Sequence, residues 1–274
     1  MEKRNKNGLT EQEFLAQYNP GDYERPSVTV DMLVLKMKED LSCMQALFIQ
    51  RKDHPFIDCW ALPGGFVGID ESAYEAACRE LQEETNLTNV YLEQVYTMTQ
   101  PKRDPRMRVI DVAYMALLPY GEAPSITAGD DARDTAWFDI QFTHNNLILH
   151  NENRGVRIEY SLSERVFKNG KLSVKNYVPA SNSEEKLAFD HSEIVLEALM
   201  KLREQVMYTD VAFNLIPDSF TLPDLQRVYE TILGKDLYKA NFREKIENKV
   251  TKLDKKGKPL TSQRTSQLYM YNGV

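Results

Sequence analysis

The stretch that decides the fold is GFVGIDESAYEAACRELQEETNL, residues 65–87. On a helix, at 100° per residue, Glu80, Glu83 and Glu84 fall within about a third of the circumference. The opposite side is then free to face a hydrophobic core. That side carries Tyr74, Ala77, Cys78, Leu81 and Thr85.

The crowded glutamates predict a metal site. Like charges at this spacing destabilise a helix by roughly 0.2–0.5 kcal/mol per pair. Mg²⁺ or Mn²⁺ requires such a cluster of hard oxygen ligands and would relieve the repulsion. A main-chain carbonyl at Gly65 is a further candidate ligand, and Arg79, one turn before Glu83, is placed to hold that carboxylate.

The ends of this helix are also specified. Ser72 and Glu75 form the pattern of a capping box at its start. Asn86 stands where the chain has to leave the helix, and asparagine tolerates the left-handed conformation that is often needed there. We therefore expect a helix over residues 72–85.

The segment from Trp60 to Leu87 resembles the Nudix signature GX5EX7REUXEEXGU, with Asn86 in place of a glycine. The resemblance implies that Glu80 and Glu84 bind metal and that Glu83 is a further ligand or activates water. With Arg79 they form the expected catalytic set for metal-dependent hydrolysis of a phosphoanhydride. A general base is expected on a variable loop, where the candidates are Glu122, Asp130 and Asp131.

Strand patterns surround the helix and predict an α/β/α sandwich with a mixed sheet. Residues 27–37 are apolar on both faces, which indicates a strand covered on both sides. The other expected strands are 44–50, 90–99, 108–118 and 135–140, with a hairpin over 156–178 that turns at Asn169-Gly170. An amphipathic pattern over 183–207 predicts a closing helix.

Charged residues are distributed unevenly along the chain. The net charge is −7, yet residues 221–274 hold 11 Lys and Arg against 6 Asp and Glu. An acidic body with a basic end indicates regions with different partners. We expect an N-terminal arm (1–24), a Nudix domain (25–207) and a winged-helix domain (208–274).

Outside the signature, the stretch Arg103-Asp-Pro-Arg106 is a candidate substrate clamp, or simply a charged turn. Together with Phe189-Asp-His191 it resembles a subgroup that contains ADP-ribose pyrophosphatases and Nudix-related regulators of NAD metabolism. That resemblance implies ADP-ribose as the substrate or ligand. His191 is expected to be a capping or packing residue rather than a catalytic base.

The end of the chain has the pattern helix, turn, helix, basic hairpin, which is typical of a winged helix and resembles the DNA-binding domain of those regulators. Its second helix would carry Lys239, Arg243 and Lys245 to DNA, and residues 255–258 would be the wing. The resemblance implies a homodimer on double-stranded DNA. The alternative is a structural or dimerising appendage.

Two hypotheses follow. The first is a Mg²⁺- or Mn²⁺-dependent hydrolase that converts ADP-ribose to AMP and ribose 5-phosphate. The second is a DNA-binding transcriptional regulator that senses ADP-ribose.

The first residues lack the apolar centre of a signal peptide, and no apolar run reaches the length of a membrane span. The three cysteines match no metal or redox motif, and we expect small buried thiols. We therefore expect a cytoplasmic protein with no membrane partner.

Overall fold

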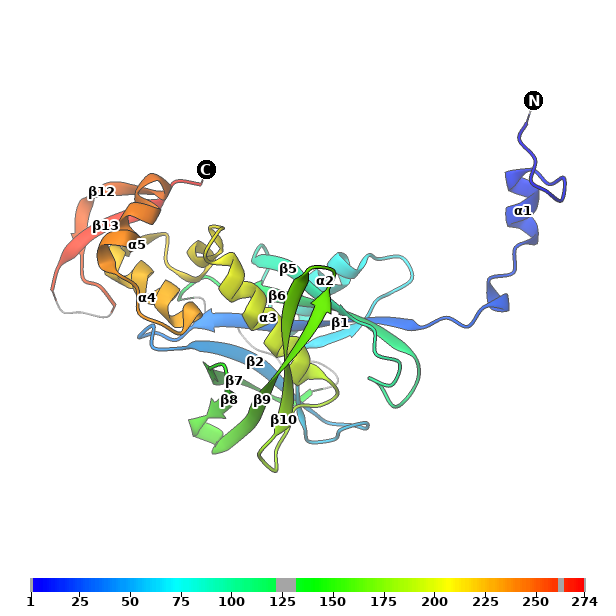
Figure 1. Ribbon diagram of the computed structural model, residues 1–274, viewed down its shortest axis with the longest axis horizontal. Helices are drawn as coiled ribbons and strands as arrows, with labels where there is room; N and C mark the ends of the chain where they lie inside the picture. The colour runs from blue at the N-terminus through cyan, green and yellow to red at the C-terminus, as the bar shows by residue number, and fades with distance from the viewer. Residues whose placement is uncertain (1, 122–131, 261–263, 274) are drawn as a thin grey trace.

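A computed structural model describes residues 2–121, 132–260 and 264–273 of the chain. A large sheet carries helix α2 on one face and helix α3 on the other, and a small helical domain lies at one end (Figure 1). The N-terminal arm, with α1 (Glu11–Gln17) and a short 3-10 turn (Pro20–Asp22), stretches away from the body. No described helix is long and apolar enough to cross a membrane.

Strand β1 (Ser27–Met37) runs through the middle of the sheet, and its side chains alternate between two cores. Val30, Met32 and Val34 pack in a cluster with residues of α2 (Ala73–Thr85). Leu33 and Leu35 pack in the other cluster, with residues of α3. The predicted strand with two buried faces is therefore confirmed, and it fixes the sandwich because each face needs its own helix.

The sheet is mixed, as predicted. β1 pairs in parallel with β6 and antiparallel with β2, and the main path runs β10-β9-β8-β7-β2-β1-β6-β5. Three described strands of this sheet were not predicted: the short β3, the short β4, which carries Gly64 and Gly65, and β8. The remaining bounds are β2 Met44–Arg51, β3 Trp60–Ala61, β4 Gly64–Phe66, β5 Tyr91–Met98, β6 Val109–Leu117, β7 Ala132–Phe142 and β8 Asn146–Asn151.

The hairpin consists of β9 (Val156–Asn169) and β10 (Leu172–Ser181), and Asn169 pairs with Leu172, so its two-residue loop lies one position later than expected. The closing helix α3 (His191–Gln205) begins eight residues later than predicted. The preceding segment is tied to the sheet instead, because Leu187 bridges to Trp60 and its N–H donates to the hydroxyl of Tyr160 at 2.8 Å.

The C-terminal elements form a winged helix. They are a 3-10 turn Val211–Leu215, β11 Ser219–Thr221, α4 Leu222–Leu233, α5 Lys239–Ile246, a 3-10 turn Glu247–Lys249, β12 Val250–Gly257 and β13 Ser266–Tyr271. Thr221 caps the start of α4, and Gly234 at φ +67° ends it. The two strands pair as far as Gly257 and Ser266, so residues 255–257 of the predicted wing lie within strand β12.

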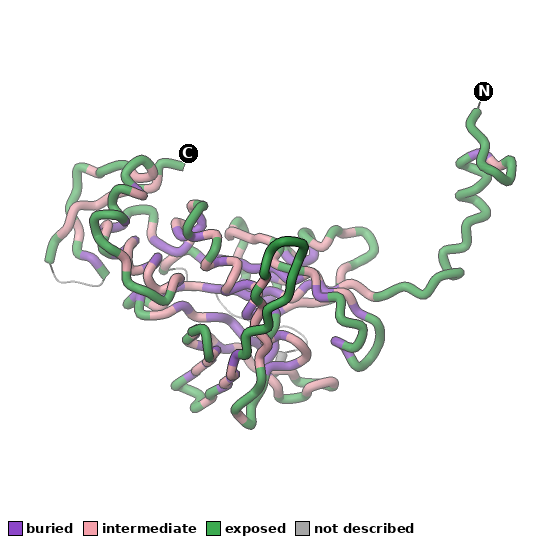
Figure 2. Tube along the Cα trace, viewed as in Figure 1, coloured by how far each residue is buried: buried purple, intermediate pink, exposed green. Residues whose placement is uncertain are grey.

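Buried segments concentrate in the large sheet and α3, whereas the N-terminal arm is exposed along almost all of its length (Figure 2). The winged helix does not have a core of its own. Phe242 and Ile246 of α5 belong to the same buried cluster as Leu199 and Leu202 of α3. The two regions are therefore packed into one continuous interior.

Candidate ligand-binding cleft

Helix α2 has the predicted ends. Ser72 and Glu75 make both hydrogen bonds of the capping box, and Asn86 adopts the left-handed conformation at φ 56°. Its buried face is rotated from the one expected. The buried residues are Ala76, Ala77, Leu81, Glu84 and Thr85, whereas Tyr74 and Cys78 are exposed. All three cysteines are free thiols, and exposed Cys78 departs from the expected buried thiol.

Arg79 organises the acidic residues of the signature. Its guanidinium donates to Glu71 and to Glu80, both at 2.8 Å, and more distantly to Glu83 at 3.4 Å. The expected link to Glu83 is thus the weakest of the three. The hydrogen bond from Arg79, with that from the backbone of Gly68, holds the pKa of Glu71 below its usual range.

Gly65 leaves room for the carboxylate of Glu80, which lies against it. A Cβ on Gly65 would stand 2.0 Å from Oε1 of Glu80, and one on Gly64 would stand 2.1 Å from the carbonyl oxygen of Val30. The glycines therefore let strand β4 pass between β1 and the acidic helix. Burial raises the pKa of Glu80 despite its pairing with Arg79.

Of the predicted metal ligands, Gly65 lies on β4 against the carboxylate of Glu80, and Glu80, Glu83 and Glu84 lie on α2. Across the described ranges, however, no three His, Cys, Asp or Glu side chains converge so as to hold a metal ion together. Arg79 takes up the carboxylate of Glu80. As they lie here, the described acidic side chains do not form a site for Mg²⁺ or Mn²⁺. The general-base candidates Glu122, Asp130 and Asp131 lie outside the described residues.

A cleft opens on the other side of β4. Its lining includes Gly65, Phe66, Arg51, Arg103, Arg106, Phe189 and His191. Asp104 aligns Arg106 through hydrogen bonds of 3.1 Å to Nε and 2.7 Å to Nη2, and the guanidinium lies 5.6 Å from the ring centre of Phe66 and 5.9 Å from that of Phe189. Cationic and aromatic groups thus share one wall.

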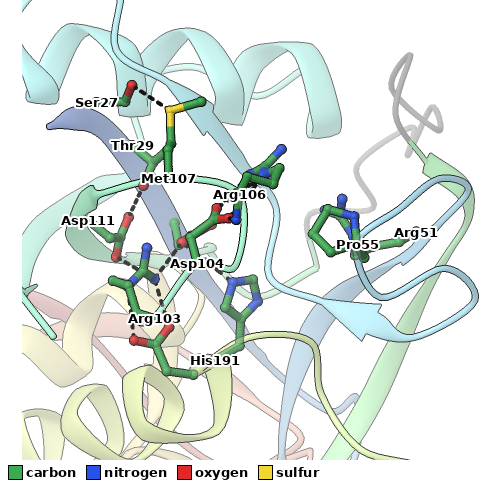
Figure 3. Close-up of polar contacts among 12 residues, drawn as sticks. Ser27, Thr29, Arg51, Pro55, Arg103, Asp104, Arg106, Met107, Asp111 and His191 are labelled. Atoms are coloured by element: carbon green, nitrogen blue, oxygen red, sulfur yellow. Dashed lines mark hydrogen bonds and ion pairs between the residues drawn. The ribbon is translucent and has the colours of Figure 1, made fainter. Parts of the chain in front are cut away.

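The guanidinium of Arg103 points toward Asp111 (Figure 3). Its side chain is 4% exposed and makes a bidentate pair with Asp190, with bonds of 2.9 and 2.7 Å. Asp31 lies 3.5 Å and Asp111 3.9 Å from the same guanidinium. Both arginines of the predicted clamp line the cleft, and each is paired with a carboxylate in this structure, Arg103 with Asp190 and Arg106 with Asp104.

Asp31 and Asp111 lie side by side on the parallel strands β1 and β6. Asp111 is fully buried, accepts a hydrogen bond from Thr29 at 3.1 Å, and has its pKa raised well above the usual range by burial and by the carboxylate of Asp31. Burial acts on Asp31 too, but His191 and Arg103 outweigh it and lower the pKa of Asp31. Burial and the neighbouring carboxylate thus favour the protonated form of Asp111, whereas the surrounding cationic groups favour the ionised form of Asp31.

His191 is a packing residue, in line with expectation. It is buried, and its Nδ1 accepts a hydrogen bond of 2.8 Å from the N–H of Leu62. Its Nε2 lies 3.5 Å from Asp31, and its ring stacks on Phe189 at 5.3 Å. Both ring nitrogens are thus engaged by the protein.

Sequence reasoning missed the carboxylates of Asp31, Asp111 and Asp190 around Arg103. A signal for two of them was present: a single acidic residue within an otherwise apolar strand, as in SVTVDMLVLKM and VIDVAYMAL, has to find a partner on folding. Which partner it finds depends on the pairing of β1 with β6, which spacing does not reveal.

The winged helix presents a separate basic face. Lys239 and Arg243 on α5 are exposed and line one hollow together with Arg227 of α4, a residue that the sequence did not single out. Lys245, the third predicted DNA contact, does not line this hollow. Its ammonium donates to the carbonyl oxygens of Met207 at 2.8 Å and Val206 at 3.4 Å, at the end of α3.

The mixed sandwich, the acidic helix after β4 and the C-terminal winged helix define a two-part protein that joins a Nudix fold to a DNA-binding fold. Family models agree: a NUDIX domain matches residues 25–156 and an NrtR DNA-binding winged helix domain matches residues 212–271. The chain belongs to the NrtR family of Nudix proteins with a C-terminal winged helix.

Relatives cover both parts. An ADPR responsive transcriptional repressor of Acinetobacter baylyi, NtrR, is 34% identical over 97% of this chain and 90% of its own length. An ADP-ribose pyrophosphatase of Methanocaldococcus jannaschii is 36% identical over 46% of this chain and 73% of its own length. The second relative matches less than half of the chain.

Solved structures show the same architecture. A MutT/nudix family protein of Enterococcus faecalis has a TM-score of 0.77 at 31% identity, covering 96% of this chain and 94% of that one. NrtR of Shewanella oneidensis in complex with a 27mer DNA has a TM-score of 0.63 at 25% identity, covering 89% and 93%. Its NUDIX domain with ADP ribose has a TM-score of 0.50 at 26% identity, covering 71% and 99%.

Proposed function

We propose that this protein is a DNA-binding transcriptional regulator whose Nudix domain binds ADP-ribose, and that ADP-ribose weakens its hold on DNA. The observation that carries the proposal is the exposed basic face of α5, with Lys239 and Arg243. The winged helix that bears this face shares its hydrophobic core with the domain that contains the cleft. Exposed cations on a recognition helix are suited to phosphate and base contacts.

The cleft supports the choice of ligand. Arg106, aligned by Asp104 beside two aromatic rings, offers a charge for a phosphate and a face for a stacked ring. ADP-ribose contains both features, and the repressor of Acinetobacter baylyi is named for its response to it. That repressor matches 97% of this chain, whereas the ADP-ribose pyrophosphatase of Methanocaldococcus jannaschii matches 46% of it, which favours ligand sensing over hydrolysis.

The test starts from a random pool of DNA duplexes, from which the full-length protein selects its preferred sequence. Anisotropy titrations with that duplex and with a scrambled one, at several salt concentrations, measure specificity and phosphate contacts. Lys239→Gln plus Arg243→Gln is expected to weaken binding and reduce the salt slope by about one per lost phosphate contact. Lys235→Gln, an exposed lysine on the neighbouring turn, is the matched control. Equal affinity for both duplexes would contradict the proposal.

The homodimer implied by the sequence resemblance belongs to this proposal. A winged helix reads one half-site, so a two-fold protein reads a palindromic duplex. Sedimentation of the protein with its selected duplex is expected to show two chains per duplex, and one chain per duplex would contradict it.

Hydrolysis of ADP-ribose is the second candidate, because the chain retains every acidic position of the Nudix signature. The test is release of AMP from ADP-ribose with Mg²⁺ or Mn²⁺. Glu83→Gln plus Glu84→Gln is expected to abolish any turnover. No turnover in the native protein, or turnover unchanged by the double substitution, would remove this candidate.

A further inference from the structure

Helix α3 joins the ligand cleft to the winged helix. Its first residue, His191, lines the cleft, and its cap residue Asp190 binds Arg103. The carboxylate of Asp190 makes no capping hydrogen bond to its own helix. The start of α3 is therefore held by the same guanidinium that faces Asp31 at the cleft floor.

The other end of α3 is held by the DNA-binding domain. Arg203 of α3 donates to the carbonyl of Ile232 in the last turn of α4, at 2.9 Å, and to that of Phe142 at the end of β7, at 2.6 Å. Its guanidinium also stacks on the Phe142 ring at 3.9 Å. From the recognition helix α5, Lys245 donates to the carbonyl of Met207 just beyond α3.

The helix between these ends is continuous and closely packed. Its 15 residues span about 22 Å, and its inner face is buried in the core that also contains Phe242 and Ile246 of α5. A close-packed interior transmits a displacement instead of absorbing it.

We propose that α3 is the element that couples the cleft to DNA, with Asp190 as its positioning residue at the cleft and Arg203 and Lys245 as its positioning residues at the winged helix. This inference rests on the proposed function and specifies how its regulation works. A diphosphate in the cleft competes with Asp190 for Arg103, because a guanidinium binds a phosphate in the same bidentate geometry in which it now binds this carboxylate. When Arg103 releases Asp190, the start of α3 is free to move. The motion of α3 then reaches α5 through Lys245.

The first variant is Asp190→Asn, which removes the charge that holds Arg103 and keeps the shape of the cap. It is expected to mimic the ligand-bound state. Without ligand it binds the selected duplex at least about fivefold more weakly than wild type, and reciprocal linkage makes it bind ADP-ribose more tightly. Wild-type affinity for both ligands would overturn the assignment of Asp190.

Two further single variants, Arg203→Gln and Lys245→Met, remove the contacts between the far end of α3 and the winged helix. These variants are expected to retain ADP-ribose binding by calorimetry while the ratio of duplex Kd values with and without ADP-ribose falls toward one. Glu204→Gln, exposed beside Arg203, is the matched control with the wild-type ratio. A full wild-type ratio in both variants would overturn the proposal.

For any variant that no longer binds DNA, amide hydrogen exchange tests whether ADP-ribose binding in the cleft still affects α5. In wild type without DNA, ADP-ribose is expected to change exchange at residues 239–246, and in Lys245→Met the change is expected to stop at α3. Relief of DNA binding with no exchange change at residues 239–246 would overturn the coupling and leave the proposed function intact. If ADP-ribose changes exchange at residues 239–246 but does not weaken DNA binding, the proposed function is overturned and the coupling through α3 stands.

Discussion

Two arginines in this chain lie among carboxylates, and they differ in burial and in the origin of their partners. Arg79 is 37% exposed, and Glu71, Glu80 and Glu83 all come from one motif. Arg103 is 4% exposed, and its partners come from β1, β6 and the cap of α3. The first cluster is a local pattern on a helix, and the second exists only once three distant segments have folded together.

The largest effect expected from this contrast is that of Arg103→Met. Removal of the cation leaves several buried carboxylates without it, and breaking a buried ionic group in this way costs about 3–5 kcal/mol. Denaturant unfolding of the full-length protein measures the loss. A change below about 1 kcal/mol would show that the cluster is better solvated than its burial indicates.

Gly65→Ala is expected to come next. Its Cβ would stand 2.0 Å from Oε1 of Glu80, so the carboxylate or the strand has to move. Overpacking of this kind costs about 1–3 kcal/mol in unfolding free energy. The companion variant is Gly65→Ala plus Glu80→Ala, in which the clash is gone. If the double variant were no more stable than the sum of the two single changes, the contact would not be the cause.

A pH series separates Asp111 from the exposed carboxylates. Its folded-state pKa is raised, so the stability it contributes is complete below the pKa of an unfolded carboxyl, near 4, and is lost as the pH rises through the folded value. Asp111→Asn does not titrate. The difference in unfolding free energy between this variant and wild type is therefore expected to shift in favour of Asn above about pH 4. A difference independent of pH would contradict the raised pKa.

Arg79→Met is expected to have the smallest effect on stability, no more than about 1 kcal/mol, because solvent screens a partly exposed ion pair. Measured in parallel with Arg103→Met, it puts a number on the comparison of the two clusters. Equal losses for the two arginines would remove the distinction between them.

The sequence predicts the parts of this protein that depend on local spacing. The α2 helix with its capping box and left-handed Asn86, the two-faced strand β1 and the winged-helix pattern were all accessible from residue order. The start of α3 was not, because Leu187 is drawn into extended structure by Trp60 and Tyr160, far away in the chain.

The dependence on contacts between distant segments also explains which site residues could be predicted from the sequence. The acidic set of α2 is visible as a motif, but the inward turn of Arg103 depends on where Asp31, Asp111 and Asp190 meet. Lys245 looks like its neighbours Lys239 and Arg243 in sequence. Only the fold shows that the end of α3 offers it two carbonyl oxygens.

The central claim is that the cleft controls the basic face without any need for hydrolysis. The direct measurement is the affinity of the full-length protein for its selected duplex in EDTA, with and without ADP-ribose. The account predicts that ADP-ribose weakens binding at least about fivefold in EDTA, the lower range of typical coupling between sites. An affinity that ADP-ribose leaves unchanged in EDTA would contradict it.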